Sequence, residues 1–250
     1  MLKKLSFLSV LVFALILIAC QKHDFDLLIN GGRIVDGTGN PGFNGDLGIV
    51  AGRIEAIGDL DGKTARETID AEGLVVSPGF IDLHTHCDRG LGESDSNANL
   101  NYLIQGTTTV VTGNCGNGSF DVAGLKADWE GRGIGTNAVH LAGMGSIRKA
   151  VLGEEPRQPT PEELDAMREL VRQAMREGAW GLSTGLEYIP NRYAETDEVI
   201  ALADVVSELG GVYATHQRNE STQVPQSVAE ITGNISRQSI HSPLRSHRGS

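Results

Sequence analysis

Apolar positions change their spacing along the chain near residue 74. Between residues 24 and 77, short apolar segments are separated by glycine-containing pairs such as Asn30-Gly31 and Ala51-Gly52. Pairs of this kind reverse the chain direction, so this region is predicted to form hairpins of a small β domain. From Leu74 onward, apolar runs alternate with stretches of helical periodicity. That alternation is typical of βα units, in which parallel strands form a sheet and helices cover it.

Strands and two clear helices are predicted in the second region. The longer helix is expected at Pro161–Glu177, because Thr160 is a favourable N-cap and proline suits the first turn. The other helix is expected at Thr196–Leu209. The fold class is therefore α/β: about five βα units with parallel strands over residues 78–230, beside a small β domain over residues 20–77. The strands are expected at Leu74–Leu83, Thr107–Thr112, Asn137–Leu141, Ala179–Ser183 and Gly211–Thr215.

The first residues have the pattern of a secretion signal. Lys3 and Lys4 precede the uncharged apolar stretch Leu5–Ala19, which ends at Cys20 after leucine, isoleucine and alanine. This junction resembles the bacterial lipobox, in which the cysteine is lipidated. We therefore expect residues 1–19 to be a signal peptide and the protein to be an exported lipoprotein, anchored to a membrane through Cys20 and periplasmic or on the outer membrane in a Gram-negative host. A transmembrane helix is disfavoured, because spanning a bilayer takes ~20 apolar residues.

The last residues differ in kind from the rest of the chain. Residues 231–250 contain arginines but neither aspartate nor glutamate, and their apolar positions follow no helical or strand period. We expect an atypical, disordered tail here. A frame change or a truncated gene would produce such a segment.

The net charge indicates which kind of molecule the protein binds, and the cysteines indicate whether a disulfide forms. The formal net charge is −11 and the isoelectric point is about 5.1, which argues against nucleic acid and anionic lipid as the main partner. A small molecule is the more natural ligand. After Cys20, the cysteines are Cys87 and Cys115, which could form a disulfide in an exported chain. Free thiols are the preferred interpretation, because Cys115 has a use as a metal ligand.

The segment Phe80–Asp88 is the strongest candidate for chemistry. An apolar run passes here into His84 and His86, directly after Pro78-Gly79. In an extended chain, alternate side chains project to the same face, about 7 Å apart, so two imidazoles could bind one metal ion. The alternative is an ordinary His-x-His pair on a solvent-facing strand.

Two further ligand types follow other predicted strands. Cys115 lies after the second strand in a glycine-rich loop, and His216 lies after the fifth. Barrel enzymes place their ligands in these loops, and thiolate with imidazole suits Zn²⁺ better than Ca²⁺ or Mg²⁺. Alone, Cys115 could be a small buried hydrophobe and His216 a core or helix N-terminal histidine. Together with His84 and His86 they favour a zinc site.

Zinc with an open coordination position favours hydrolysis of an amide or ester, because it polarises the carbonyl and acidifies bound water to a pKa of ~7. Such a reaction also needs a general base. Asp82 and Asp88 lie on the same face as His84 and His86. Their expected roles are to orient the imidazoles or to cap the chain.

These motifs together resemble the N-acyl-D-amino-acid deacylases, or D-aminoacylases, of the amidohydrolase superfamily. The resemblance runs from about residue 24 to about residue 230. The residues that carry it are Pro78-Gly79-Phe80-Ile81-Asp82 followed by His84-Thr85-His86, then Gly113-Asn114-Cys115-Gly116, the segment Gly181–Pro190 with Tyr193-Ala194, and His216-Gln217-Arg218-Asn219-Glu220.

The resemblance implies a distorted TIM barrel beside a small β-sandwich and the zinc-dependent hydrolysis of N-acyl-D-amino acids. It implies that Cys115 and His216 hold zinc tightly, together with a further histidine on strand six. His84 and His86 would lie at the same centre, near a weaker metal position that shares the cysteine. Tyr188 is similar to a tyrosine that contacts substrate in such enzymes; the alternative is a packing aromatic under the loop.

The chain departs from the family pattern in three places. The strand-six histidine in a Ser-His-Leu-Lys context is missing, and His241 and His247 lie in different surroundings. The aspartate of strand eight, which serves as general base, has no counterpart, so the catalytic residue is unknown. Gly143-Met144-Gly145 stands where Gly-His-Gly is common. We therefore expect little turnover by the chain as given.

Two other functions compete with the deacylase. A non-catalytic, membrane-tethered remnant would retain the ligands without the base, and an incomplete barrel would expose strand edges. A dihydroorotase or dihydropyrimidinase-like enzyme would bridge two metals with a carbamylated lysine after strand four. The sequence has no lysine after Lys149, and that strand runs into Ser183-Thr184-Gly185. This disfavours the cyclic amidohydrolase.

Overall fold

The computed structural model describes residues 23–235. The chain divides into two compact units, one ending at Pro78 and the other beginning at Gly79, next to the predicted boundary. The expected signal peptide, Cys20, His241 and His247 lie outside the described residues. Within residues 23–235, no helix is both long enough and apolar enough to cross a membrane.

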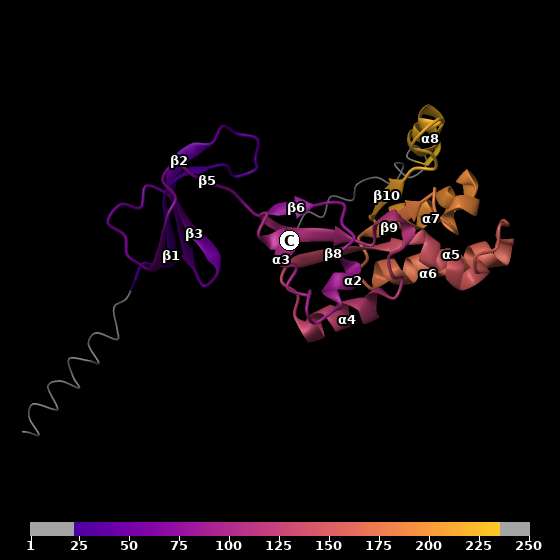
Figure 1. The fold of residues 1–250 in the computed structure, drawn as a ribbon, viewed down its shortest axis with the longest axis horizontal. Coiled ribbons are helices and arrows are strands. Elements are labelled where there is room, and N and C mark those ends of the chain that lie inside the picture. Colours follow the sequence, from indigo (N-terminus) through magenta and orange to yellow (C-terminus); the bar gives the residue numbers. More distant parts are fainter. Residues whose placement is uncertain (1–22, 236–250) are drawn as a thin grey trace, which may run out of the picture. The chain divides into compact units, whose positions relative to one another are not determined.

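The first unit is a β sheet, which confirms a β-rich N-terminal region (Figure 1). The sheet order is β3-β2-β1-β4, and β5 also pairs with β1. Neighbouring strands β1, β2 and β3 are antiparallel, whereas β4 and β5 run parallel to β1. The strands are β1 (Phe25–Ile34), β2 (Phe43–Val50), β3 (Arg53–Gly58), β4 (Ala65–Asp70) and β5 (Val75–Val76).

One of the two predicted turns in this unit is correct and the other is wrong. Ala51-Gly52 joins β2 to β3, and both residues have positive φ angles, 49° and 73°. Asn30-Gly31 instead lies inside β1, where the register with β2 shifts between Ile29 and Gly32. The strand continues because its later residues pair with β5, and the Gly31 N–H donates to Asp46 Oδ1 at 2.8 Å. The glycine therefore marks a bulge.

The second unit contains a parallel sheet of order β10-β9-β8-β7-β6, which confirms the predicted α/β class with sequential βα units. β6 and β10 are its outer strands (Figure 1). The sheet curls into a half-barrel. Its strands are β6 (Phe80–Asp82), β7 (Thr107–Thr112), β8 (Asn137–Gly143), β9 (Gly181–Gly185) and β10 (Val212–His216).

The predicted first strand, Leu74–Leu83, is wrong in extent. It divides into β5, which belongs to the first unit, and β6, which belongs to the second. Pro78 and Gly79 separate them, because proline lacks the N–H that a continuous strand would use. His84 and His86 consequently lie in the loop after β6.

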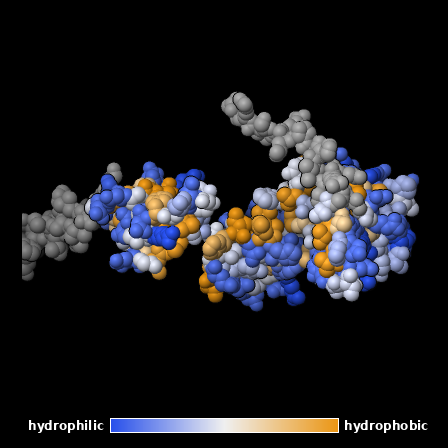
Figure 2. Space-filling model, turned by 90° about the horizontal axis from the view of Figure 1, so that it is seen from above, coloured by the Kyte–Doolittle hydropathy of each residue, from blue (hydrophilic) through white to orange (hydrophobic). Residues whose placement is uncertain are grey.

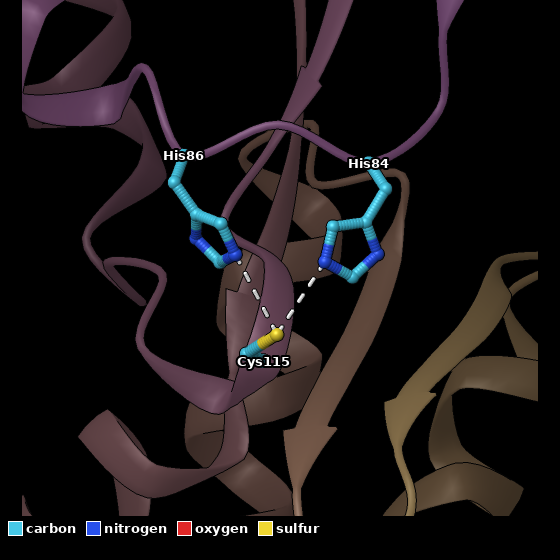
Figure 3. Close-up of side chains that lie close together, drawn as sticks. All are labelled: His84, His86 and Cys115. Carbon is cyan, nitrogen blue, oxygen red and sulfur yellow. Dashed lines mark hydrogen bonds between the residues drawn. The ribbon is translucent and has the colours of Figure 1, made fainter.

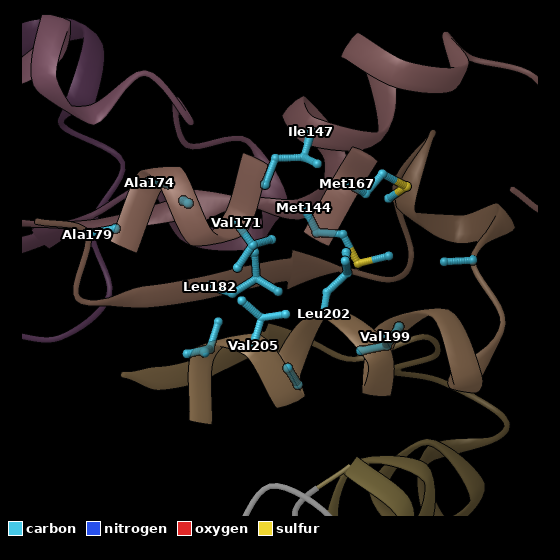
Figure 4. Packing of buried hydrophobic residues seen from close by; sticks show 14 of the residues in the cluster. Met144, Ile147, Met167, Val171, Ala174, Ala179, Leu182, Val199, Leu202 and Val205 are labelled. Atoms are coloured by element: carbon cyan, nitrogen blue, oxygen red, sulfur yellow. The ribbon is translucent and has the colours of Figure 1, made fainter. Parts of the chain in front are cut away.

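Helices cover this sheet, and the main core lies between β9 and α5, α6 and α7 (Figure 4). Leu182 of β9 is fully buried, as are Met144, Val171 and Leu202 from the three helices. The helices are α2 (Asp88–Leu91), α3 (Leu100–Leu103), α4 (Val122–Arg132), α5 (Met144–Leu152), α6 (Pro161–Arg176), α7 (Thr196–Glu208) and α8 (Val224–Ala229), with short helical turns η1 (Asn114–Gly116), η2 (Asn191–Tyr193) and η3 (Glu230–Ile235).

The start of the predicted tail is helical. Residues 231–235 belong to the π-helical turn η3, which directly follows α8. The expectation of a disordered tail stays a prediction. Residues 236–250 lie outside the described part.

The N-cap of α6 provides a first test of the fold. Thr160 Oγ1 accepts the Glu163 N–H at 3.3 Å, and Glu163 Oε2 accepts the Thr160 N–H at 2.8 Å. Replacing Thr160 by alanine removes one half of this capping box, so we expect the free energy of unfolding to fall by about 1 kcal/mol. Urea denaturation measures it. An unchanged midpoint would show that water caps the helix equally well.

Candidate metal centre

The turn that carries Cys115 has an unusual backbone. Cys115 lies in η1 with φ 57° and ψ 28°, a left-handed conformation that costs a non-glycine residue about 1–2 kcal/mol. Three hydrogen bonds hold the turn: Gly113 N–H donates to Asp88 Oδ1 at 2.6 Å, Asn114 Nδ2 to the Val111 carbonyl at 2.9 Å, and Gly116 N–H to Ser183 Oγ at 3.0 Å. The surroundings thus fix the direction of the thiol.

Glycines allow this turn to pack directly on β9. A Cβ added to Gly185 would lie 2.3 Å from the Cys115 carbonyl oxygen. A Cβ added to Gly116, whose φ is 76°, would lie 2.7 Å from the Asn191 amide atoms and 2.9 Å from Gly185 N. These distances are shorter than van der Waals contact permits. The glycines of the predicted motifs therefore set the position of the sulfur.

Substitution of Gly116 tests this role. We expect Gly133→Ala to lose about 1–2 kcal/mol of unfolding free energy, because its φ is positive. Gly116→Ala should lose more, because its Cβ would also clash with Asn191 and Gly185. Only Gly116→Ala should also weaken zinc binding, since nothing lies within 4 Å of a Cβ on Gly133. Unfolding curves and zinc titrations of both variants separate the two effects. Equal zinc affinities would show that the turn tolerates a methyl group.

Three imidazoles lie around the Cys115 sulfur. Sγ is 3.5 Å from His84 Nε2 and 3.6 Å from His86 Nε2, the arrangement in Figure 3. It is 4.0 Å from His216 Nδ1. Between the two exposed histidines, Thr85 is buried and its hydroxyl donates to the Val111 carbonyl at 2.8 Å. This anchor places His84 and His86 on one side, as the alternation in sequence predicts.

The distances fit a zinc ion. Tetrahedral zinc, with bonds of about 2.0–2.1 Å to nitrogen and about 2.3 Å to sulfur, separates a nitrogen and a sulfur ligand by about 3.6 Å. The Cys115 to His84 and His86 separations match this value. His216 Nδ1 lies farther from the sulfur, at 4.0 Å, and the His216 ring groups with Glu187 and Glu220 instead of with the other two histidines. His84, His86 and Cys115 also satisfy the spacing of a three-donor metal group.

The thiols are free, as expected from the sequence: neither Cys87 nor Cys115 forms a disulfide. Burial raises the pKa of the Cys115 thiol, and the Glu220 carboxylate raises it further. Without a metal the sulfur is thus a thiol near neutral pH. Binding of zinc would release that proton, because the ligand is the thiolate.

Tyr188 lies beside His216. Its hydroxyl is 3.4 Å from His216 Nδ1, and the two ring centroids are 4.7 Å apart. The side chain follows β9 and is 42% exposed, so it faces the site instead of packing beneath the loop. Partial desolvation and the nearby acidic groups Cys115, Glu187 and Glu220 raise the pKa of the phenol, which therefore keeps its proton.

The aspartates near the histidines bind backbone groups. Asp82 Oδ1 accepts the His84 N–H at 3.0 Å, and Asp88 Oδ1 accepts the Gly113 N–H at 2.6 Å. The expected roles are to orient the imidazoles or to cap the chain, and in the structure both aspartates cap backbone N–H groups. Within the described residues no hydrogen bond joins either carboxylate to the imidazole of His84 or His86. Asp82 and Asp88 therefore hold the loops that carry the donors.

Three polar residues near the site were missed from the sequence. His216 Nε2 is 3.2 Å from Glu187 Oε2 and 3.6 Å from Glu220 Oε1. Both glutamates lie in the quoted motifs, and the spacing of four between His216 and Glu220 was an available signal. Buried His140 of β8 pairs Nδ1 with Thr112 Oγ1 at 2.8 Å, and burial lowers its pKa. Its position in an apolar strand gave no sign of that contact.

Comparisons with known proteins agree with this geometry. The model of the amidohydrolase family matches residues 67–227. The D-aminoacylase of Alcaligenes xylosoxydans xylosoxydans is 39% identical over 234 residues, which cover 84% of this chain and 48% of that enzyme. The N-acyl-D-aspartate deacylase of the same organism is 36% identical over 229 residues, covering 82% and 46%. The chain thus spans about half the length of these curated relatives.

A solved relative has the same fold. The N-acyl-D-glutamate deacylase of Bordetella bronchiseptica, crystallised with zinc and a phosphonate mimic of the tetrahedral intermediate, is 35% identical and superposes with a TM-score of 0.79. The match covers 86% of this chain and 49% of that one. The family match over residues 67–227 and these relatives lead to one conclusion: the chain belongs to the amidohydrolase family and is similar to its D-aminoacylases and N-acyl-D-amino-acid deacylases.

Proposed function

We propose that this chain carries the zinc-binding half of an enzyme that hydrolyses the amide bond of N-acyl-D-amino acids. The observation that carries this proposal is the convergence of three imidazole nitrogens on the Cys115 sulfur, within 3.5 to 4.0 Å. We propose Cys115, His84, His86 and His216 as the zinc ligands. Relatives that act on N-acyl-D-amino acids support the substrate class.

Each residue of the site would have a defined part in the reaction. When bound, zinc would polarise the amide carbonyl and lower the pKa of a water molecule. Cys115 and the histidines would hold the ion. Asp82 and Asp88 would keep these donors in place, because they accept hydrogen bonds from the backbone of the loops that carry them. The protonated Tyr188 hydroxyl faces the same space and would donate a hydrogen bond to an oxygen of the substrate.

Near the ends of β6 and β7, none of the described carboxylates is a candidate for the general base. Asp82 and Asp88 are engaged with backbone N–H groups, and a base must reach the proton that it removes. Glu187 and Glu220, on the β9 and β10 side, face His216 Nε2. The described carboxylates therefore support metal binding and substrate orientation more fully than proton transfer. We expect hydrolysis to require βα units beyond β10, and little turnover by the 250-residue chain.

Zinc titration with a competing chelator, followed by assays on N-acetyl-D- and N-acetyl-L-amino acids, tests the proposal. We expect the folded chain to bind zinc and to show little turnover of the D substrate and none of the L substrate. A folded chain that binds no zinc would overturn the metal centre. Fast zinc-dependent hydrolysis of the D substrate would instead show that the described residues already contain the base.

We also propose that the protein is an exported bacterial lipoprotein anchored through Cys20. The lysines, the apolar stretch and the lipobox-like junction support this localisation. We expect Cys20→Ser to move the protein out of the membrane fraction and to abolish labelling by a radioactive fatty acid. Cys87→Ser, which leaves the junction intact, is the control. Equal labelling of both variants would contradict lipidation of Cys20.

A further inference from the structure

We propose that Glu187, assisted by Glu220, fixes the tautomer of His216 so that Nδ1 is left as the metal donor. This inference rests on the proposed function, because it concerns how the chain presents a zinc ligand. Neither glutamate is a ligand in this proposal. Both are positioning residues that act through His216.

The groups that face the His216 ring determine which of its two nitrogens carries the proton. Nε2 lies 3.2 Å from Glu187 Oε2 and 3.6 Å from Glu220 Oε1. Ionised carboxylates only accept hydrogen bonds, so the nitrogen between them must carry the N–H. A neutral imidazole has one N–H, and Nδ1 is then left with a lone pair. The two carboxylates therefore select one of the two tautomers.

The groups on the other side of the ring suit the same tautomer. Nδ1 faces the Cys115 sulfur at 4.0 Å and the Tyr188 hydroxyl at 3.4 Å. A phenol can donate its proton to a lone pair at Nδ1, whereas an N–H at that position would have the phenol oxygen and the more distant sulfur as acceptors. The opposite tautomer would also direct the Nε2 lone pair at two anionic groups. Both sides of the ring thus favour the same assignment.

Two neighbouring loops hold the ring from different strands. Glu187 follows β9, and Glu220 follows β10, whose last residue is His216. The Leu186 N–H donates to the His216 carbonyl at 2.9 Å, which ties the two loops together at this point. The His216 side chain is 18% exposed, so its hydrogen bonds are partly shielded from water. A carboxylate bonded to the distal nitrogen is how proteins commonly orient a metal-binding histidine.

Nitrogen NMR of the metal-free full chain tests the tautomer directly. The protein is labelled with ¹⁵N-histidine and measured near pH 8, where an unperturbed imidazole is neutral. His216→Gln assigns the resonances. We expect wild-type His216 to carry its proton on Nε2, and the double variant Glu187→Gln/Glu220→Gln to show a mixture of both tautomers, since a glutamine amide can donate as well as accept. An Nδ1–H tautomer in the wild type would overturn the proposal.

Zinc affinity provides the second measurement. We expect Glu187→Gln to weaken zinc binding by about 10- to 100-fold, the usual effect of losing such a partner. The control is Glu195→Gln, because Glu195 is an exposed glutamate at the start of α7 that makes no hydrogen bond to His216. Equal affinities of the two variants would overturn the proposal. So would a second tightly bound metal that disappears in Glu187→Gln, because Nε2 would then be a ligand.

The two measurements separate this inference from the proposed function. If the wild type bound no zinc but kept its proton on Nε2, the metal centre would fail while the carboxylate control of His216 would stand. If zinc bound tightly and Glu187→Gln changed neither affinity nor tautomer, the metal centre would stand and the positioning role would fail.

Discussion

Replacement of Cys115 by alanine is expected to lower the zinc affinity of the chain by at least about 100-fold, because loss of a direct ligand exceeds the effect of losing an outer partner. The sulfur is the donor shared by His84, His86 and His216 in the structure. Its removal leaves three imidazoles without the anionic charge that offsets the ion. His216→Ala is expected to have nearly the same effect. Chelator competition measures the affinities.

Cys87→Ala is the matched control for this experiment. Cys87 is also buried and free, but its sulfur contacts Thr85 and Asn99 and is absent from the donor group. We expect this variant to bind zinc as the wild type does. If Cys115→Ala retained stoichiometric zinc, or if both cysteine variants lost it equally, Cys115 would not be a specific ligand.

Replacement of Arg148 by methionine is expected to lower the free energy of unfolding by about 3–5 kcal/mol, the cost of leaving one partner of a buried ion pair unpaired. Arg148 of α5 and Glu198 of α7 are 0% and 3% exposed at their side chains. Arg148 Nη1 donates to both Glu198 carboxylate oxygens at 2.6 Å, and Nη2 donates to the Arg157 carbonyl. Urea denaturation followed by tryptophan fluorescence reports the second unit, which contains both tryptophans.

Two further variants identify the cause of the loss. Lys149→Met breaks the neighbouring pair with Glu154, which is largely exposed, and should cost less than about 1 kcal/mol. Arg148→Met/Glu198→Leu removes both buried charges and should recover most of the stability. If the single and double variants were equally unstable, packing around Arg148 would explain the loss instead of the unpaired carboxylate.

The stability of Arg148→Met should depend on pH. Burial already raises the pKa of Glu198, although the Arg148 hydrogen bond opposes that shift. Without the arginine the pKa should rise further in the folded state. The folded protein then binds a proton that the unfolded chain releases, so stability is retained below the unfolded pKa and lost as the pH rises through the folded one. Arg148→Met should therefore be less impaired near pH 5 than near pH 8.

Features that depend on local spacing were predictable from the sequence. The alternation of apolar runs and helical stretches predicted the positions of β7 to β10, because a strand buried among helices needs a continuous apolar run. Thr160, as a favourable N-cap, predicted the start of α6. The positions of Cys115 and His216 after strands led to their expected proximity, since the ends of parallel strands meet at one edge of the sheet.

Features that depend on distant contacts were not predictable. Pro78-Gly79 marks the break inside Leu74–Leu83, but the sequence does not show that β5 pairs with β1 of the first unit while β6 pairs with β7 of the second. The Arg148–Glu198 pair joins residues 50 apart and depends on how two helices pack. Glu187 and Glu220 look like ordinary surface glutamates in sequence. Their role depends on how the loops after β9 and β10 meet.

The outer position of β6 has a practical consequence for anyone who handles this protein. Among the described strands it pairs with β7 alone, and Phe80, Ile81 and Leu83 are 62%, 62% and 70% exposed. Hydrophobic patches are visible on the surface (Figure 2). A free strand edge with apolar side chains is a template on which another chain can form β structure. The colloidal behaviour of concentrated samples should therefore depend on this short strand, and Ile81→Lys should raise the concentration at which they precipitate.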